Sequence, residues 1–157
     1  MSEISLKPVD LEKLGTHSNL LQSAFWGSLK AEFGWKAYAF RINKQSLLVL
    51  VREIKAGQSL AYVPHGPMSD GEIAELWNHT AELAVVLRPH LPASCMFIRF
   101  DPPWGISLPA LTKTPSGYPA EALSPKQSFT KARMDIQPPS TVILDLNKPE
   151  DELLKGM

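Results

Sequence analysis

Proline placement sets the strongest limit on how this chain can fold. Eight of its 14 prolines lie between Pro102 and Pro139, in a chain of 157 residues. Each proline lacks a backbone N–H and restricts the residue before it, so this stretch is incompatible with a regular helix or a central strand. We therefore expect a Pro-rich, irregular excursion over 101–139 that separates two strands of one sheet.

The residues before this excursion have the hydrophobic spacing of strands and helices. Ser23 stands where a helix N-cap is expected and Gly34 where a helix stops, with Phe25, Trp26, Leu29 and Phe33 at helical spacing between them. We expect, in order, a short strand within 1–10, a helical turn at 10–14, a helix over 23–34, an antiparallel meander of 35–42, 46–54 and 59–63, a helix over about 71–88, and a buried strand over 95–100 whose apolar residues belong to the core.

The residues after the excursion predict one more strand and the start of a helix. Segment 141–146 is rich in β-branched residues, and Asn147 is the expected N-cap of a helix with Pro149 near its first turn. Because this helix is cut short with Leu153 and Leu154 on it, we expect a fragment of a longer protein, marginally stable or dimeric. The fold class predicted for 1–157 is mixed α/β, a single domain with a largely antiparallel sheet and helices on its faces.

Charge and composition exclude several classes of function. Lys+Arg and Asp+Glu both number 16, so the formal net charge is zero, which argues against a nucleic-acid-binding protein. The longest nearly uncharged apolar stretch, 46–51, is far shorter than the ~20 residues of a membrane-spanning helix. No signal peptide is apparent either, so we expect a cytoplasmic protein.

The residues with metal-binding or nucleophilic side chains are few and scattered. The single cysteine, Cys95, lies in an apolar run and is interpreted as a core residue in preference to a catalytic thiol. The four histidines include no pair at the spacing that lets two imidazoles bind one metal from a helix face. We predict no metal site and no cofactor.

Four local sequences together resemble those of a known enzyme family. They are Leu21-Gln-Ser-Ala-Phe-Trp-Gly-Ser-Leu-Lys30, Leu60-Ala-Tyr-Val-Pro-His-Gly-Pro67, Phe97-Ile-Arg-Phe-Asp-Pro-Pro-Trp104 and Ile136-Gln-Pro-Pro-Ser-Thr-Val-Ile-Leu-Asp-Leu146. In this order and at these separations they resemble the peptidoglycan-bridge aminoacyltransferases of the FemABX family. Those enzymes use aminoacyl-tRNA to add amino acids to the peptide of a cell-wall precursor.

The resemblance implies a fold and different functions for its two subdomains. Family members resemble two acetyltransferase-like (GNAT-like) subdomains in tandem, with the precursor in the groove between them, and 1–157 would be the first subdomain. The residues nearest the transfer chemistry lie largely in the second, so the resemblance implies no catalytic residue here and no activity of this half alone. The implied partners are a UDP-linked muropeptide or lipid-linked precursor, and aminoacyl-tRNA only through the second half.

The segment 22–30 supplies two candidate binding residues through this resemblance. Its counterpart in relatives contributes to the site for the UDP-linked precursor. Lys30 offers a flexible ammonium to a diphosphate. Trp26 offers a ring on which a sugar or nucleobase can stack. The alternatives are a solvated lysine on an exposed helix face and a tryptophan of the core.

Four further candidates lie on two of the predicted strands or in the turn that follows one of them. The segment 62–67, at the end of the third meander strand, supplies three of them, Tyr62, His65 and Gly66. Gly66 permits close backbone approach to a ligand, and His65 offers a hydrogen bond. A tight turn with no ligand explains the same residues. Arg99 offers a guanidinium to an anion, or pairs with Asp101 two residues along the strand as a structural bridge.

Three other functions stay open. The chain is also compatible with a non-catalytic binding module that docks onto a partner chain or forms a homodimer, and with the remnant of a truncated gene. An acyl-CoA-dependent N-acyltransferase ranks lower, because the sequence lacks the clustered glycines that hold a pyrophosphate at a helix N-terminus.

Overall fold

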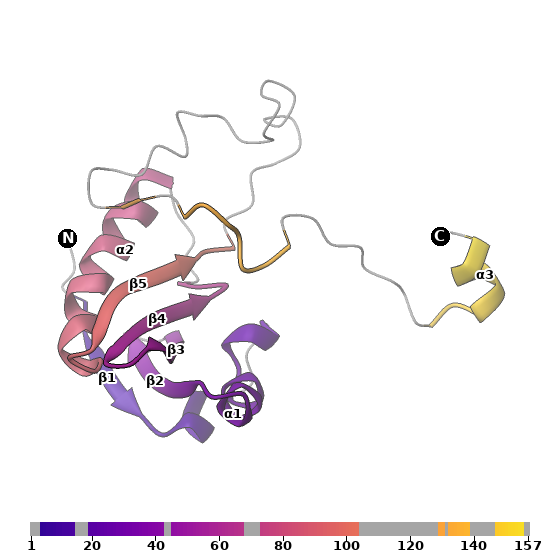
Figure 1. Ribbon diagram of the computed structural model, residues 1–157. Coiled ribbons are helices and arrows are strands. Elements are labelled where there is room, and N and C mark those ends of the chain that lie inside the picture. Colours follow the sequence, from indigo (N-terminus) through magenta and orange to yellow (C-terminus); the bar gives the residue numbers. More distant parts are fainter. Residues whose placement is uncertain are drawn as a thin grey trace.

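The computed structural model describes residues 4–14, 19–42, 45–67, 73–103, 129–130, 132–138 and 147–155. It contains a five-stranded sheet in the order β1-β2-β3-β4-β5, with helices on its faces (Figure 1). The described elements are β1 (Leu6–Val9), η1 (Leu11–Leu14), η2 (Leu20–Gln22), α1 (Ala24–Glu32), β2 (Lys36–Ile42), β3 (Gln45–Lys55), β4 (Gln58–Pro64), α2 (Ile73–Leu87), η3 (Arg88–His90), β5 (Cys95–Asp101) and α3 (Glu150–Lys155).

The sheet is mostly antiparallel, as the sequence predicts. β1 through β4 pair with their neighbours in antiparallel register, whereas β4 and β5 are parallel and α2 makes the crossover between them. Gly57, in the two-residue turn between β3 and β4, has a φ of +73°, a conformation that such tight hairpin turns require and glycine adopts at little cost. The predicted mixed α/β class and the three-stranded meander are therefore confirmed.

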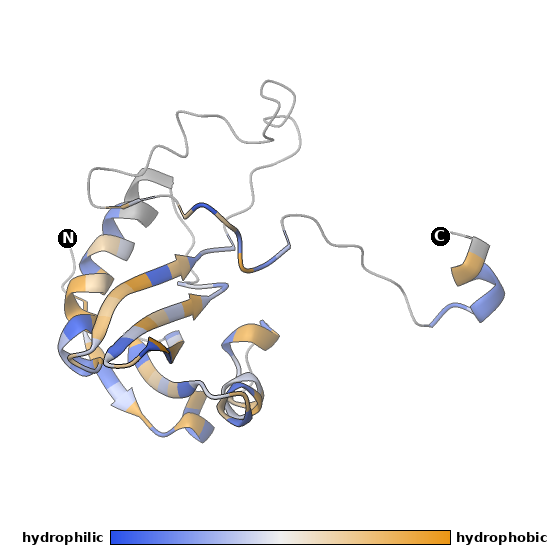
Figure 2. Cartoon of the chain, viewed as in Figure 1, coloured by the Kyte–Doolittle hydropathy of each residue, from blue (hydrophilic) through white to orange (hydrophobic). Residues whose placement is uncertain are grey.

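Alternation along the strands divides the core between the two faces of the sheet. Leu47, Val49 and Val51 of β3 lie in the cluster that also holds Leu83 and Leu87 of α2. The intervening residues of β3 lie in a second cluster, against which side chains of η1 and α1 pack. Figure 2 shows these apolar residues running along the strands between the helices.

A buried glutamine connects α1 to the end of the β3–β4 ladder. The Gln22 side chain, 1% exposed, accepts a hydrogen bond from the N–H of Leu48 at 2.8 Å and donates to the carbonyls of Leu48 and Pro64. Leu50 and Tyr62 form the last backbone pair of the ladder at this end. The carboxamide therefore satisfies strand groups just beyond the point where the two strands stop pairing.

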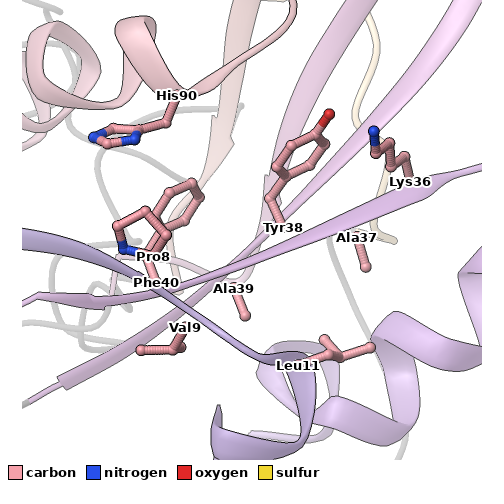
Figure 3. Close-up of a pocket in the computed structure, with 9 residues that line it drawn as sticks. All are labelled: Pro8, Val9, Leu11, Lys36, Ala37, Tyr38, Ala39, Phe40 and His90. Atoms are coloured by element: carbon pink, nitrogen blue, oxygen red, sulfur yellow. The ribbon is translucent and has the colours of Figure 1, made fainter.

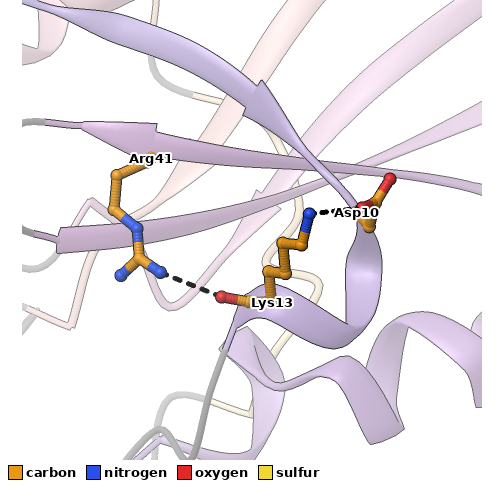
Figure 4. Close-up of polar contacts among 3 residues, drawn as sticks. All are labelled: Asp10, Lys13 and Arg41. Atoms are coloured by element: carbon orange, nitrogen blue, oxygen red, sulfur yellow. Dashed lines mark hydrogen bonds and ion pairs between the residues drawn. The ribbon is translucent and has the colours of Figure 1, made fainter.

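Polar contacts hold η1 against the β2–β3 hairpin (Figure 4). The Lys13 ammonium of η1 lies 2.8 Å from the carboxylate of Asp10, the residue just before η1. The Arg41 guanidinium donates to the Lys13 carbonyl at 2.9 Å and to the Ser46 hydroxyl at 3.0 Å, and that hydroxyl donates to the Leu14 carbonyl at 3.0 Å. The turn predicted at 10–14 is thus present and fixed by side chains from two strands.

The boundaries of α1 agree with the prediction, but its buried face does not. The Ser23 hydroxyl caps the helix by accepting from the N–H of Trp26, and Gly34 has a φ of +79° just past the helix end. Phe25 and Phe33, expected on the buried face, are 63% and 65% exposed. The helix instead packs through Ala24, Trp26 and the buried Gly27.

Gly27 is the buried residue of α1 and explains this packing. A Cβ at this position would lie 2.7 Å from a methyl carbon of Leu11 and 3.2 Å from one of Leu48. The missing side chain lets the helix backbone approach the sheet closely. Helical spacing of aromatic residues therefore placed Trp26 correctly but Phe25 and Phe33 wrongly, because the close approach is made by the residue without a side chain.

β5 is an edge strand of this sheet and is only partly buried. Cys95 is buried in the core, which confirms its expected structural role, but Met96 and Phe97 are 54% and 48% exposed. The sequence predicted a buried strand with both residues in the core. The prediction was wrong because an apolar run does not show how many neighbours its strand has. Asp101, placed by prediction in the excursion, is the last residue of β5.

The described residues after β5 contain one helix, α3. It begins at Glu150 and not directly after Asn147, and the Pro149 carbonyl accepts from the N–H groups of Glu152 and Leu153. Residues 129–130 and 132–138 form neither helix nor strand, as predicted for the excursion, whereas 104–128 and the predicted strand 141–146 lie outside the described residues. Among the described helices, none has the length and apolar character needed to cross a membrane.

Replacing Gln22 by alanine should lower the free energy of unfolding by about 2–3 kcal/mol, because buried backbone groups of β3 and β4 lose their partners. Urea denaturation followed by circular dichroism measures this loss. The matched control is Gln58→Ala, an exposed glutamine on β4, which should change stability by less than about 0.5 kcal/mol. Equal losses in the two variants would contradict a structural role for the Gln22 carboxamide.

Candidate functional site

The candidate site lies where the two parallel strands β4 and β5 end. Tyr62 is opposite Arg99 in the register, and Pro64 is opposite Asp101. Tyr62 belongs to the core cluster on the α1 face, and the alternation of side chains places Arg99 and Asp101 on that same face. Carboxyl ends of neighbouring parallel strands are a recurrent position for ligand sites in open sheets.

The Tyr62 hydroxyl is fixed from both sides. It donates to Oδ2 of Asp101 at 2.8 Å and accepts from Nε2 of Gln137 at 3.2 Å. Burial, and to a smaller extent the neighbouring Asp101 carboxylate, raises the pKa of Tyr62 well above its ordinary value of 10.0, although the Gln137 hydrogen bond and the Arg99 charge act in the opposite direction. The hydroxyl therefore stays protonated and serves as a hydrogen-bond donor at neutral pH.

Arg99 and Asp101 do not form the structural bridge that their spacing allows. The Arg99 guanidinium donates to the backbone carbonyl of Met134, whereas the Asp101 carboxylate accepts from Tyr62. A guanidinium carries five N–H donors, so one neutral carbonyl leaves most of its hydrogen-bonding capacity for other partners. Arg99 therefore retains the ability to bind an anion.

Trp26 and Lys30 lie on the same face of α1, four residues apart, and contact each other. The Lys30 ammonium lies 4.7 Å from the centroid of the Trp26 ring. Trp26 packs against the core cluster of the α1 face, and its Nε1 is buried with no hydrogen-bond partner among the described atoms. Trp26 is thus partly a core residue, which is one of its two expected roles, and Lys30 is held at its ring.

Sequence reasoning missed Trp35 and Arg52. The Trp35 ring lies 6.3 Å from that of Tyr62, and the Arg52 guanidinium carbon lies 5.5 Å from the Trp35 ring centroid. Gln137, the partner of Tyr62, was also not singled out. These contacts join residues far apart in the chain, and no local motif marks them.

The turn after β4 is fixed by protein contacts. His65 has a φ of +43°, and its carbonyl accepts from Nδ2 of Asn19 at 3.3 Å. A Cβ on Gly66 would lie 3.0 Å from a methyl carbon of Val63 and 3.1 Å from Nε2 of Gln22. The close backbone approach at Gly66 is therefore to the Gln22 side chain, which supports the alternative of a tight structural turn.

No family model, curated protein or solved structure matches this chain. Its function is therefore inferred from its own residues. Among the residues that the structure describes, no three His, Cys, Asp or Glu side chains gather in a position to hold a metal ion.

The α1 face of the sheet carries two groups of aromatic rings and cations. One is Trp26 with Lys30 on α1, and the other is Trp35, Arg52 and Tyr62, beside which Arg99 lies in the register. Two of the cations are each held at an aromatic ring, which leaves their N–H donors available. Asp101 is a nearby carboxylate, and it is hydrogen-bonded to Tyr62. Such a surface suits a ligand that carries a planar ring and an anionic group. We call it the aromatic–cation surface, and it comprises Trp26, Lys30, Trp35, Arg52, Tyr62 and Arg99.

Substituting Tyr62 by phenylalanine should lower the free energy of unfolding by about 1 kcal/mol at neutral pH, because Asp101 and Gln137 lose a partner. The variant should also be less sensitive to alkali. Since folding raises the pKa of Tyr62, its contribution is fully present below the unfolded value of 10.0 and is lost as the pH rises through the folded pKa.

Urea denaturation at pH about 7.5 and about 11 tests both expectations. The stability difference between wild type and Tyr62→Phe should shrink at the higher pH. Tyr38→Phe, which removes the hydroxyl of a β2 tyrosine, is the control for general alkaline effects, and its difference from wild type should not change in this way. A Tyr62→Phe difference that is constant or grows with pH would rule out the proposed protonated hydroxyl.

Proposed function

We propose that this chain binds the UDP-linked muropeptide precursor as the precursor-binding half of an aminoacyl-tRNA-dependent transferase. The observation that carries the proposal is the gathering of rings and cations on the aromatic–cation surface. Three of the four local sequences that resemble the FemABX family, 21–30, 60–67 and 97–104, contribute residues to it. The mostly antiparallel sheet with helices on its faces supports a GNAT-like subdomain.

Lys30 and Arg99 are the groups we assign to the diphosphate. Lys30 is held by the Trp26 ring, which leaves its three N–H donors for phosphate oxygens. Arg99 has a fork of donors that matches phosphate geometry, and it contacts one backbone carbonyl. Neither cation has a carboxylate partner within ion-pair distance among the described residues, so an incoming phosphate need not break a salt bridge.

The aromatic side chains are assigned to the uracil and sugar rings. Trp26 and Trp35 each have a cation over the ring, Lys30 and Arg52 respectively. We assign the planar rings of the ligand to stacking beside these ring–cation pairs. His65 and Gly66 have structural roles in the turn that positions the end of β4. We assign no catalytic residue to this chain, and aminoacyl transfer would require the second half.

Isothermal titration calorimetry with UDP-N-acetylmuramoyl-pentapeptide tests this function. We expect saturable binding by wild type and at least about ten-fold weaker binding by Lys30→Ala, because a charge-assisted contact to phosphate is lost. Lys55→Ala removes an exposed lysine at the end of β3 and is the matched control. Its affinity should equal that of wild type.

Two further ligands separate this function from its alternatives. UDP alone should bind more weakly than the full precursor but show the same dependence on Lys30. Acetyl-CoA should not raise the melting temperature, because an acyltransferase would be stabilised by its cofactor through mass action. Absence of binding to the precursor, or stabilisation by acetyl-CoA alone, would overturn the proposal.

A further inference from the structure

A groove of about 420 Å³ lies at the β1 edge of the sheet, beside the end of β1 and the first half of β2 (Figure 3). This volume falls within the range of small-ligand sites. The end of β1, the start of η1 and the η3 turn form its sides, and β2 forms its base. The described lining residues are Pro8, Val9, Leu11, Lys36, Ala37, Tyr38, Ala39, Phe40 and His90.

The backbone edge of β2 is open at this groove. β3 pairs with β2 over its whole length, from Lys36 to Ile42, whereas β1 pairs only with the part from Ala39 to Ile42. The chain leaves β1 after Val9 and turns into η1, so no strand of the described residues pairs with Lys36 to Tyr38 on that side. Because hydrogen-bonding directions alternate along a strand, at least one of these three residues directs its N–H and C=O into the groove.

The side chains add an apolar floor and a positive charge. Phe40 is buried, and its ring contacts that of His90 edge to face at a centroid distance of 5.6 Å. The Lys36 ammonium lies 5.2 Å from the Tyr38 ring centroid, at the far end of the groove from Pro8. The described lining residues include an ammonium and an imidazole but no carboxylate, so the charge of the groove favours an anion.

We propose that this groove binds the C-terminal three residues of a peptide by strand addition to β2, with the terminal carboxylate at Lys36. A peptide that continues the line of β1 runs antiparallel to β2 and advances from Tyr38 towards Lys36. Three residues of extended chain span about 10 Å, the length of the open edge. The direction of the added strand therefore brings its C-terminus to the ammonium, and an apolar side chain of the peptide lies against Phe40 and His90.

The ligand class follows from these three features together. The open edge recognises backbone, the floor recognises an apolar side chain, and Lys36 recognises a free carboxylate. The groove and the aromatic–cation surface use different residues. The proposal of peptide binding in the groove therefore does not rest on precursor binding at the aromatic–cation surface.

Nuclear magnetic resonance of the full chain, titrated with acetyl-Val-Thr-Leu as the free acid or as the C-terminal amide, tests the proposal. The free acid should shift the amide signals of Val9 and of Lys36 to Tyr38. The amide should bind at least about ten-fold more weakly, because the charge-assisted contact is lost. Changes confined to other residues, or equal affinity for the two peptides, would overturn the proposal.

Charge variants at the rim provide the matched comparison. Lys36→Glu should weaken binding of the free acid by at least about ten-fold, and Lys36→Arg should keep it within about three-fold of wild type. Lys55→Glu makes the same charge change on an exposed lysine outside the groove and should leave binding unchanged. Unchanged affinity in a folded Lys36→Glu variant would show that the peptide carboxylate makes no contact with Lys36 and would overturn the proposal. Groove signals that shift with protein concentration before any peptide is added would show that a second copy of the chain occupies the groove, and would also overturn it.

Discussion

The buried carboxamide of Gln22 is the contact on which the rest of the structure depends. It joins the α1 side of the molecule to β3 through Leu48 and to β4 through Pro64. Pro64 has no N–H to offer, and backbone pairing between the two strands ends at Leu50 and Tyr62. A side chain with both a donor and an acceptor is the chemical type that can bind both strands at this point.

This contact also fixes the surroundings of the candidate site. Gly66 lies so close to the Gln22 amide that a Cβ would meet it, which positions the turn leaving β4. Trp26 and Lys30 follow in α1, four residues apart, and therefore share one face of that helix. The position of the Lys30 ammonium on this face of the sheet is thus a consequence of how α1 is docked, through Gln22 just before the helix and Gly27 within it.

Elements set by local rules could be predicted from the sequence. The β2 and β3 segments, the Ser23 cap and the Gly34 stop each depend on neighbours in the chain, and the structure has them where the pattern predicts. The exposure of Phe33 and Phe97 could not be predicted in this way. Burial depends on which elements lie opposite, and periodicity does not contain that information.

The candidate site shows the same division. Trp26, Lys30, Tyr62 and Arg99 were identified from local motifs, and the structure places them on one side of the sheet, whereas His65 and Gly66 belong to a turn held by protein contacts. Trp35, Arg52 and Gln137 were missed because their contacts join distant parts of the chain. A residue type and its spacing indicate what chemistry is available, but only the register of β4 against β5 brings Tyr62 next to Asp101.

The contacts of the segment 132–138 determine what an anion must displace to reach Arg99. Met134 gives the guanidinium a neutral carbonyl, while Gln137 donates separately to the Tyr62 hydroxyl. Hydrogen bonds between a guanidinium and a phosphate are roughly twice as strong as those between neutral groups. In the proposed complex, a phosphate would replace the Met134 carbonyl at Arg99 and form the stronger hydrogen bond. The Gln137 contact can persist through that exchange, because the Tyr62 hydroxyl keeps its proton and its partner Asp101.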